Sequence, residues 1–271
     1  MLYDTHCHPY LSKEKSQKET LERFFCGTDR YLNSIAVDIS SSFQSIHLAQ
    51  EYNWVFASIW IHPTSTQEYI GRQERVIQIL SELYEKYQDD IIAIGESGLD
   101  YYWLKKISQE HNISREDFRQ IQKDFFIAQI RLAQKLKLPL IIHNREASKD
   151  IFEILKAENF TNFVFHCYSE DLKFAQKLIE FAPECKLWFG WVITFKNATE
   201  VQKTAINIPL KNIIIETDAP YLTPVPYRWK EENEPLYCQY VLEKIIELRS
   251  ESPEEIMKTI FENSVEFFIK K

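Results

Sequence analysis

Short runs of apolar and mostly β-branched residues recur along the chain, and a longer amphipathic stretch follows most of them. Continuous apolar runs of this kind are typical of parallel strands buried on both faces, because half-exposed strands alternate apolar and polar positions. The pattern predicts eight strands, at Leu2–Thr5, Ser34–Asp38, Val55–Ile61, Ile91–Gly95, Leu138–Ile142, Phe163–Phe165, Cys185–Phe189 and Asn212–Ile215.

The segments between these runs have apolar residues at helical spacing. The clearest helices are expected at Arg72–Tyr87, Phe118–Leu136, Asp171–Phe181 and Tyr237–Leu248. A last helix is expected to begin at Ser252-Pro253-Glu254-Glu255, which offers an N-cap, a proline in the first turn and a capping-box Glu. Tyr101–Asp117 is long and is predicted to be a loop with extra local helix.

Strands alternating with helices over 271 residues predict the α/β class and a (β/α)₈ TIM barrel, with residues 1–271 forming a single domain. A doubly wound sheet is the alternative. Its dinucleotide-binding form is disfavoured because no Gly-rich loop follows the first strand. The sequence also lacks a Pro/Ser/Gly-rich linker that would divide the chain.

Composition indicates a soluble globule, with 45% hydrophobic and 27% charged residues. No apolar run approaches the roughly 20 residues of a membrane helix, and the N-terminus does not resemble a signal peptide. Five scattered cysteines are expected to be reduced thiols, so we expect a cytoplasmic protein. We also expect no obligate protein partner. A net charge of −8 argues against non-specific coating of DNA. A local nucleic-acid site stays possible, because bound metal ions dominate the charge around them.

Histidines and acids collect where the predicted strands end. In a barrel these ends meet at one face, where barrel active sites lie. The residues are His6 and His8 after the first strand, His62 after the third, Glu96 after the fourth, His143 after the fifth, His166 after the sixth and Asp218 after the eighth. A single such histidine is more often a buried hydrogen-bonded residue than a ligand, whereas their joint placement indicates a metal site.

Residue types and spacing point to two divalent ions. Side chains alternate along a strand, so His6 and His8 share one side and Cys7 points away, where a packing role is expected. Imidazole with carboxylate suits Zn²⁺, Mn²⁺ or Fe, and oxygen-rich positions tolerate Mg²⁺. The candidate ligands exceed the needs of one open catalytic site, so we expect a bridging carboxylate, for which Glu96 is the candidate. Two ions suit phosphoester hydrolysis.

The chain resembles the TatD family of metal-dependent hydrolases, within the amidohydrolase-like barrels. The matching motifs extend nearly from end to end. They are Asp4-Thr5-His6-Cys7-His8, Ile61-His62-Pro63, Ile94-Gly95-Glu96-Ser97-Gly98-Leu99-Asp100-Tyr101-Tyr102, Leu138-Pro139-Leu140-Ile141-Ile142-His143-Asn144-Arg145-Glu146-Ala147, His166-Cys167-Tyr168-Ser169, Ile215-Glu216-Thr217-Asp218-Ala219-Pro220-Tyr221-Leu222, Asn233-Glu234-Pro235 and Asn263.

This resemblance implies a cytoplasmic, divalent-metal-dependent deoxyribonuclease that acts as an exonuclease on DNA ends. It also implies a role for each matching position. His6, His8, Glu96 and Asp218 correspond to a first metal site, and Glu96, His143 and His166 to a second. Asp218 corresponds to the acid that orients and deprotonates the attacking water, with Glu96 as the other catalytic residue.

Three further residues are candidates at the rim of the site. We expect His62 and Arg145 to contact a phosphate or a leaving group, because an arginine can donate two parallel hydrogen bonds to phosphate. The alternative for Arg145 is an ion pair with Glu146 or Glu96. Asp100 either orients a metal ligand or caps the following loop.

The chain departs from the family pattern around the predicted substrate. Gly-Ile-His-Pro-His is replaced by Trp60-Ile61-His62-Pro63-Thr64, and His-Cys-Phe-Ser-Gly by His166-Cys167-Tyr168-Ser169-Glu170. Arg-Gly-Lys-Arg-Asn-Glu-Pro is replaced by Arg228-Trp229-Lys230-Glu231-Glu232-Asn233-Glu234-Pro235. The proposed ligands are unchanged, whereas the rim has gained negative charge. These changes keep two alternatives open: an esterase or amidase such as a D-aminoacyl-tRNA deacylase, and a non-enzymatic barrel.

Overall fold

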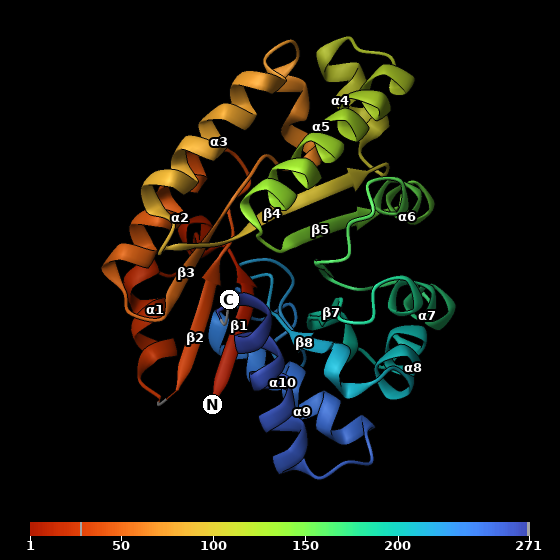
Figure 1. Cartoon of the computed structure of the whole chain (residues 1–271). Coiled ribbons are helices and arrows are strands. Elements are labelled where there is room, and N and C mark those ends of the chain that lie inside the picture. The colour runs from red at the N-terminus through yellow and green to blue at the C-terminus, as the bar shows by residue number, and fades with distance from the viewer. Residues whose placement is uncertain (28, 270–271) are drawn as a thin grey trace.

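Eight parallel strands lie at the centre of the protein in the computed structural model, and helices surround them (Figure 1). The structure describes residues 1–27 and 29–269; residues 28 and 270–271, which the predicted domain includes, lie outside the described residues. Each strand pairs with the next one along the chain. The strands are β1 (Leu2–Cys7), β2 (Arg30–Ser34), β3 (Val55–Ile59), β4 (Ile91–Asp100), β5 (Leu140–Arg145), β6 (Phe163–Phe165), β7 (Lys186–Phe189) and β8 (Ile213–Ile215).

The sheet closes on itself between β1 and the residues that follow β8. The backbone N–H of Asp218 donates to the carbonyl of His6 at 2.9 Å, and that of His8 donates to the carbonyl of Ala219 at 2.6 Å. An eight-stranded parallel sheet with alternating helices is therefore a (β/α)₈ barrel, as predicted, and the doubly wound alternative is wrong.

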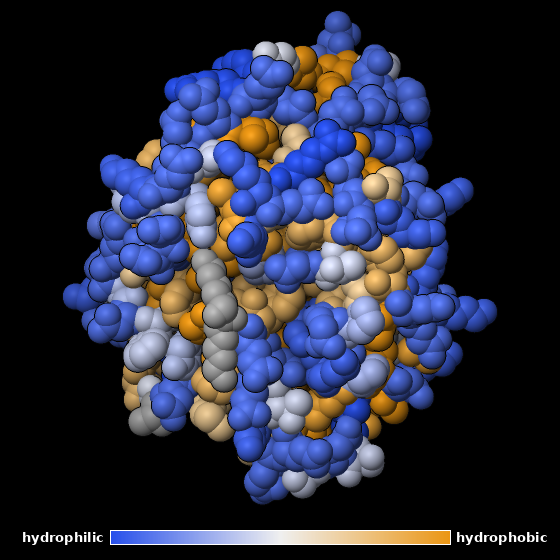
Figure 2. Space-filling view, in the orientation of Figure 1, coloured by the Kyte–Doolittle hydropathy of each residue, from blue (hydrophilic) through white to orange (hydrophobic). Residues whose placement is uncertain are grey.

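The helices lie on the outside of the barrel, and the predicted extra helix is present as α4. Ser252 caps the last helix as expected, because its hydroxyl accepts from the N–H of Glu255 at 3.2 Å. No helix of residues 1–27 and 29–269 is long and apolar enough to cross a membrane. Hydrophilic side chains cover most of the face in Figure 2. The α-helices are α1 (Gln17–Phe25), α2 (Ile39–Glu51), α3 (Gln73–Tyr87), α4 (Leu104–His111), α5 (Arg115–Leu136), α6 (Ser148–Ala157), α7 (Leu172–Phe181), α8 (Thr199–Asn207), α9 (Cys238–Leu248) and α10 (Pro253–Phe268).

The second strand is the clearest error in the predicted elements, because β2 ends at Ser34, where the predicted strand begins. Ile35 and Ala36 are fully buried, but their segment is an irregular connection, and Ile35 packs in the interior cluster with Ile141 and Trp188. The last residue of this connection, Asp38, caps α2 by accepting from the N–H of Ser41 at 2.7 Å. The apolar run therefore marked burial rather than strand structure.

Aromatic and aliphatic side chains fill the barrel below the face that carries the histidines. Ile141, Val164, Trp188 and Ile214 are fully buried and form one cluster with Phe268 at the end of α10. The Trp188 ring stacks on Phe268, with centroids 5.9 Å apart. The interior is thus a packed core that supports the site from below.

Strand β4 extends five residues beyond the predicted end at Gly95, and Gly98 makes this extension possible. Gly98 pairs with His143 of β5 and has a φ of 145°, a conformation that favours glycine. A Cβ atom at this position would overlap the carbonyl oxygen of His143. Because of this close approach, β4 carries Glu96 in its middle and Asp100 at its end.

Gly98→Ala is therefore expected to destabilise the fold by more than about 2 kcal/mol, because it adds steric overlap to an unfavourable φ. Gly71→Ala is the matched control, since Gly71 also has a positive φ, 72°, but a Cβ there meets no atom within 4 Å. Urea unfolding of both variants measures the difference. Equal free energies of unfolding would contradict the close approach between β4 and β5.

Candidate metal centre

Strand geometry places His6 and His8 on the inner side of the barrel mouth. Their Nε2 atoms lie 3.2 Å apart. Cys7 points the other way, where it is fully buried and its thiol donates to the carbonyl of Asn33 at 3.4 Å. The alternation predicted for this motif is confirmed, and so is the packing position of Cys7.

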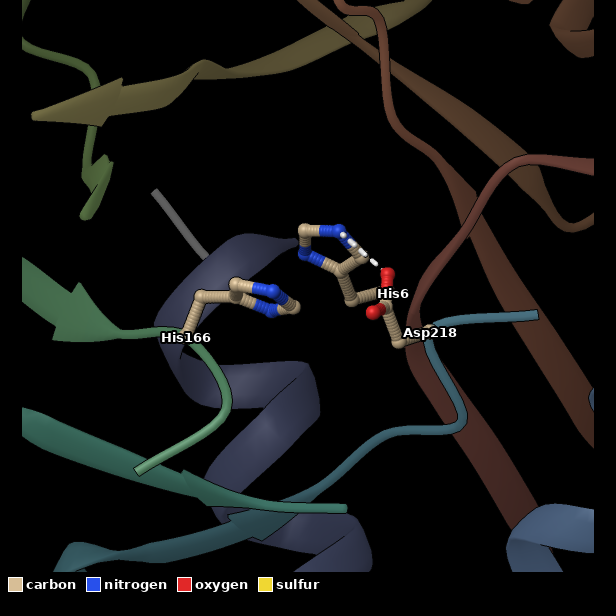
Figure 3. A group of neighbouring side chains, drawn as sticks. All are labelled: His6, His166 and Asp218. Carbon is tan, nitrogen blue, oxygen red and sulfur yellow. Dashed lines mark ion pairs between the residues drawn. The ribbon is translucent and has the colours of Figure 1, made fainter. Parts of the chain in front are cut away.

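Asp218 and Glu96 complete a first group with these two histidines. Asp218 Oδ1 lies 3.6 Å from His6 Nε2 and 3.4 Å from His8 Nε2. Glu96 Oε2 lies 3.6 Å from the same His6 atom. Figure 3 shows Asp218 reaching toward His6, while the His166 ring stacks on that of His6 with centroids 3.8 Å apart.

His143 and His166 both lie near the other oxygen of Glu96. The donor atoms within 4.8 Å of one another put His143 in a group with Glu96 and His62, and His166 in a group with His6 and Asp218. Glu96 Oε1 lies 2.7 Å from His143 Nδ1 and 3.4 Å from His166 Nε2. Glu96 is buried, and one of its carboxylate oxygens faces His6 while the other faces His143 and His166. This arrangement is that of a carboxylate able to bridge two ions.

The distances within each group suit ions held by several donors at once. Atoms that bind one ion at roughly 2.0–2.2 Å lie about 3.0–3.5 Å apart when the angle between them is near-tetrahedral or near-octahedral. Most separations of this centre are 3.2–3.6 Å. Nitrogen and carboxylate oxygen are also the donors preferred by Zn²⁺ and Mn²⁺. The residues present therefore fit divalent metal ions.

Both His8 and His143 have their second ring nitrogen held by a hydrogen bond, which fixes the ring that faces the centre. His8 Nδ1 lies 2.7 Å from the carbonyl of Ile35. His143 Nε2 lies 3.0 Å from Asp100 Oδ2. Asp100 Oδ1 meanwhile accepts from the N–H of Trp103 at 3.0 Å, so both contacts expected of Asp100 occur together.

Glu216 is a buried residue of the centre to which the sequence pattern gave no role. Its Oε2 lies 2.7 Å from His166 Nδ1, and its Oε1 accepts from the N–H of Cys167 at 2.8 Å. Glu216 follows the buried strand residue Ile214 by two positions, so strand alternation could have indicated that it points inward.

Asp4 is a second buried acid that was not singled out. It accepts from the backbone N–H of Thr217 at 2.9 Å and from the Thr217 hydroxyl at 2.6 Å. These contacts join β1 to the segment that carries Asp218. Asp4 shares the side of His6 by alternation, which is the signal that could have identified it.

The carboxylates of the centre attract positive charge. Burial alone would lower the pKa of His166, but Glu216 and Glu96 raise it to about 10. Burial alone would also lower the pKa of His143, but hydrogen bonds to Asp100 and Glu96 raise it to about 9. His6 differs, because burial and the neighbouring His166 hold its pKa well below the usual value. A bound cation would compensate the same negative charge of the carboxylates as these protons do.

The two predicted substrate contacts lie in different environments. His62 is half-buried at the centre, with its Nε2 3.3 Å from His143 Nδ1 and 3.9 Å from Glu96 Oε1. Arg145 is exposed at the end of β5, and its guanidinium lies 3.9 Å from the centroid of the Tyr102 ring. Among the described residues Arg145 has no ion pair, so the expected alternative partners Glu146 and Glu96 do not engage it.

Comparison with known proteins gives matches that cover nearly the whole chain. A family model described as TatD related DNase matches residues 3–269. An uncharacterized metal-dependent hydrolase of Bacillus subtilis, YabD, is 34% identical over 99% of both chains. The uncharacterized metal-dependent hydrolase YcfH of Escherichia coli K12 is 29% identical over 98% of this chain and 95% of its own.

Solved structures share the fold over the same extent. YjjV, a TatD homologue from Escherichia coli, superposes with a TM-score of 0.85 at 23% identity, covering 98% of this chain and 97% of its own. A TatD family hydrolase from Entamoeba histolytica has a TM-score of 0.83 at 18% identity, covering 100% of this chain and 98% of its own.

Proposed function

This chain belongs to the TatD family of metal-dependent hydrolases, and we propose that it is a deoxyribonuclease that removes nucleotides from DNA ends. Two divalent ions, drawn from Mg²⁺, Mn²⁺ and Zn²⁺, are held in this proposal by six side chains at one end of the barrel. These are His6, His8, Glu96, His143, His166 and Asp218.

The position of Glu96 carries the proposal. Its two oxygens face separate groups of donors, at 3.6 Å from His6 Nε2 and 2.7 Å from His143 Nδ1. Two adjacent ions suit a phosphodiester, because its attacking and leaving oxygens lie on opposite sides of one phosphorus atom.

The remaining roles follow from exposure and contact. Bound metal ions lower the pKa of a coordinated water and stabilise negative charge on the phosphate. Asp218 accepts the proton of the attacking water, and its side chain is 15% exposed, so water can reach it. Arg145, whose guanidinium lies against the Tyr102 ring, donates to a phosphate or leaving group. His62 contacts the phosphate beside Glu96.

The proposal predicts metal-dependent degradation of single-stranded DNA. Purified protein with Mg²⁺ or Mn²⁺ should shorten an end-labelled oligonucleotide, and EDTA should stop the reaction. Hydrolysis of a D-aminoacyl-tRNA by a preparation inactive on DNA would favour the deacylase alternative. Less than one bound metal ion per chain after loading with Mn²⁺ or Zn²⁺ would favour a non-enzymatic barrel.

Glu216→Gln is expected to weaken metal binding by roughly 10- to 100-fold, because the charge that orients His166 is lost while the shape is kept. Calorimetric titration with Zn²⁺ measures the change. A melting temperature close to that of the wild type for the metal-stripped variant shows that the fold is intact. Unaltered affinity in a folded variant would exclude a positioning role for Glu216.

A further inference from the structure

A pocket of about 310 Å³ lies beside the metal centre, at the lower end of the size range of small-molecule sites. Phe195, Leu222 and Trp229 form its apolar walls. Tyr221, next to Leu222, ties the pocket to the centre: its ring lies 5.9 Å from that of His8. The pocket therefore opens at the same barrel end as the candidate ligands.

Trp229 combines high exposure with a left-handed backbone conformation. Its side chain is 84% exposed, and its φ of 66° lies in the left-handed region that favours glycine. A bulky residue in this conformation is unfavourable, and an exposed indole gains little from packing within the chain. Trp54 also has a positive φ, and what distinguishes Trp229 is its place in the pocket at the barrel end that carries the candidate ligands.

The loop that carries Trp229 is held in place on both sides. The Thr223 hydroxyl donates to the carbonyl of Glu231 at 2.6 Å, and the rings of Tyr227 and Tyr237 stack with centroids 4.8 Å apart. The exposed indole is thus presented by a fixed loop, which reduces the entropy lost when a ligand stacks on it.

Two cations accompany the indole. The Arg228 guanidinium lies 3.6 Å from the centroid of the Phe195 ring and 5.0 Å from that of Trp229. Lys230 is exposed at the pocket wall. Within the described residues neither Arg228 nor Lys230 is paired with a carboxylate, so both are available to an anionic ligand.

The two acids of this loop are occupied by other donors. Glu232 accepts from the Ser12 hydroxyl at 2.6 Å and from the N–H of Lys13 at 3.0 Å. Glu231 accepts from the Tyr237 hydroxyl at 2.5 Å and lies 3.7 Å from Lys15 Nζ. Their carboxylates therefore fasten the loop to its neighbours, and among the other described lining residues the charges without an ion pair are Arg228, Lys230 and the exposed Glu14.

We propose that this pocket binds an unpaired nucleobase of the DNA strand that is being cleaved. This inference rests on the proposed deoxyribonuclease function. The base stacks on Trp229, and Arg228 and Lys230 contact the phosphate attached to it. Stacking on an aromatic ring accepts any base, which suits an enzyme that shortens strands of any sequence. The pocket thus holds the strand while its adjacent phosphodiester lies at the metal centre.

Trp229→Gly tests this site, because glycine suits the φ of 66° and removes the stacking surface. With the Mn²⁺-loaded enzyme, the KM for a hexathymidylate should rise roughly tenfold in this variant, and kcat should change little. For a hexamer of equal length with abasic terminal nucleotides, the KM of the wild type should already be high. Trp229→Gly should raise this KM less than twofold. Quenching of tryptophan fluorescence by hexathymidylate should likewise fall in the variant, independently of turnover.

Trp54→Gly is the matched control, since Trp54 is also exposed, has a φ of 71° and lies just before β3 at the opposite barrel end. It should bind hexathymidylate as the wild type does. Equal KM values for Trp229→Gly and Trp54→Gly, with unaltered quenching, would overturn the base site while leaving the nuclease proposal intact. A wild type that cleaves neither hexamer, but whose quenching is lost in Trp229→Gly, would instead overturn the nuclease proposal and leave a pocket that binds a base without cleavage.

Discussion

Glu96→Ala is expected to abolish detectable hydrolysis and to leave fewer than two metal ions bound per chain. The loss in kcat/KM should exceed the roughly 10²–10⁴-fold that removal of a general base typically costs. The reason is that Glu96 supplies a donor to both groups, with one oxygen 3.6 Å from His6 Nε2 and the other 3.4 Å from His166 Nε2. Elemental analysis after loading with Mn²⁺ or Zn²⁺ measures the bound metal, and an end-labelled oligonucleotide measures the activity.

Glu170→Ala is the control for the loss of a carboxylate at this barrel end. Glu170 accepts from the amide of Asn144 at 2.8 Å and from the hydroxyl of Ser148 at 2.6 Å, and it contacts none of the candidate ligands. This variant should bind metal as the wild type does. A full complement of metal in Glu96→Ala would show that the two donor groups do not share this carboxylate.

The candidate ligands could be predicted because they depend on local signals. A buried parallel strand is recognisable as a short apolar run, and the residue two positions beyond an inward-pointing side chain points inward too. His143 and His166 follow Ile141 and Val164 in this way, and all four lie on the inner side of the barrel. A barrel fold then brings the strand ends together without further information.

Contacts between distant segments account for what could not be predicted. Strand β4 passes Gly95 because Gly98 lies against the backbone of β5, and a glycine in a sequence gives no indication of its neighbour. The segment after β2 is as apolar as a strand, yet it is an irregular buried connection to α2. The Arg145 guanidinium lies against the Tyr102 ring, although Glu146 follows it in the sequence and Glu96 lies in the candidate metal centre.

The acidic rim shows the same dependence on distant partners. Relative to the family pattern, the rim has gained negative charge at Glu170, Glu231 and Glu232. In the structure Glu232 accepts hydrogen bonds from residues 12–14, and Glu170 accepts them from Asn144 and Ser148. Because the cations Arg228 and Lys230 stay unpaired within the described residues, the count of charges along the loop does not represent the charge presented to a substrate.

Asp218→Asn should separate catalysis from metal binding. We expect turnover to fall by roughly 10²–10⁴-fold, because an amide cannot accept the proton of the attacking water. Metal binding should be largely retained, since asparagine keeps an oxygen that faces His6 and His8. The backbone should tolerate the change, because Asp218 has a φ of 59° and asparagine adopts this region as readily as aspartate.

His6→Ala is the comparison variant for this prediction, because it is expected to lose metal as well as activity. His6 Nε2 lies 3.6 Å from both Glu96 Oε2 and Asp218 Oδ1, so its loss should remove metal together with activity. Metal content and turnover, measured on both variants from one loading protocol, distinguish a proton acceptor from a ligand. If Asp218→Asn loses as much metal as His6→Ala, then Asp218 acts through the metal alone, and another group at the barrel mouth must accept the proton.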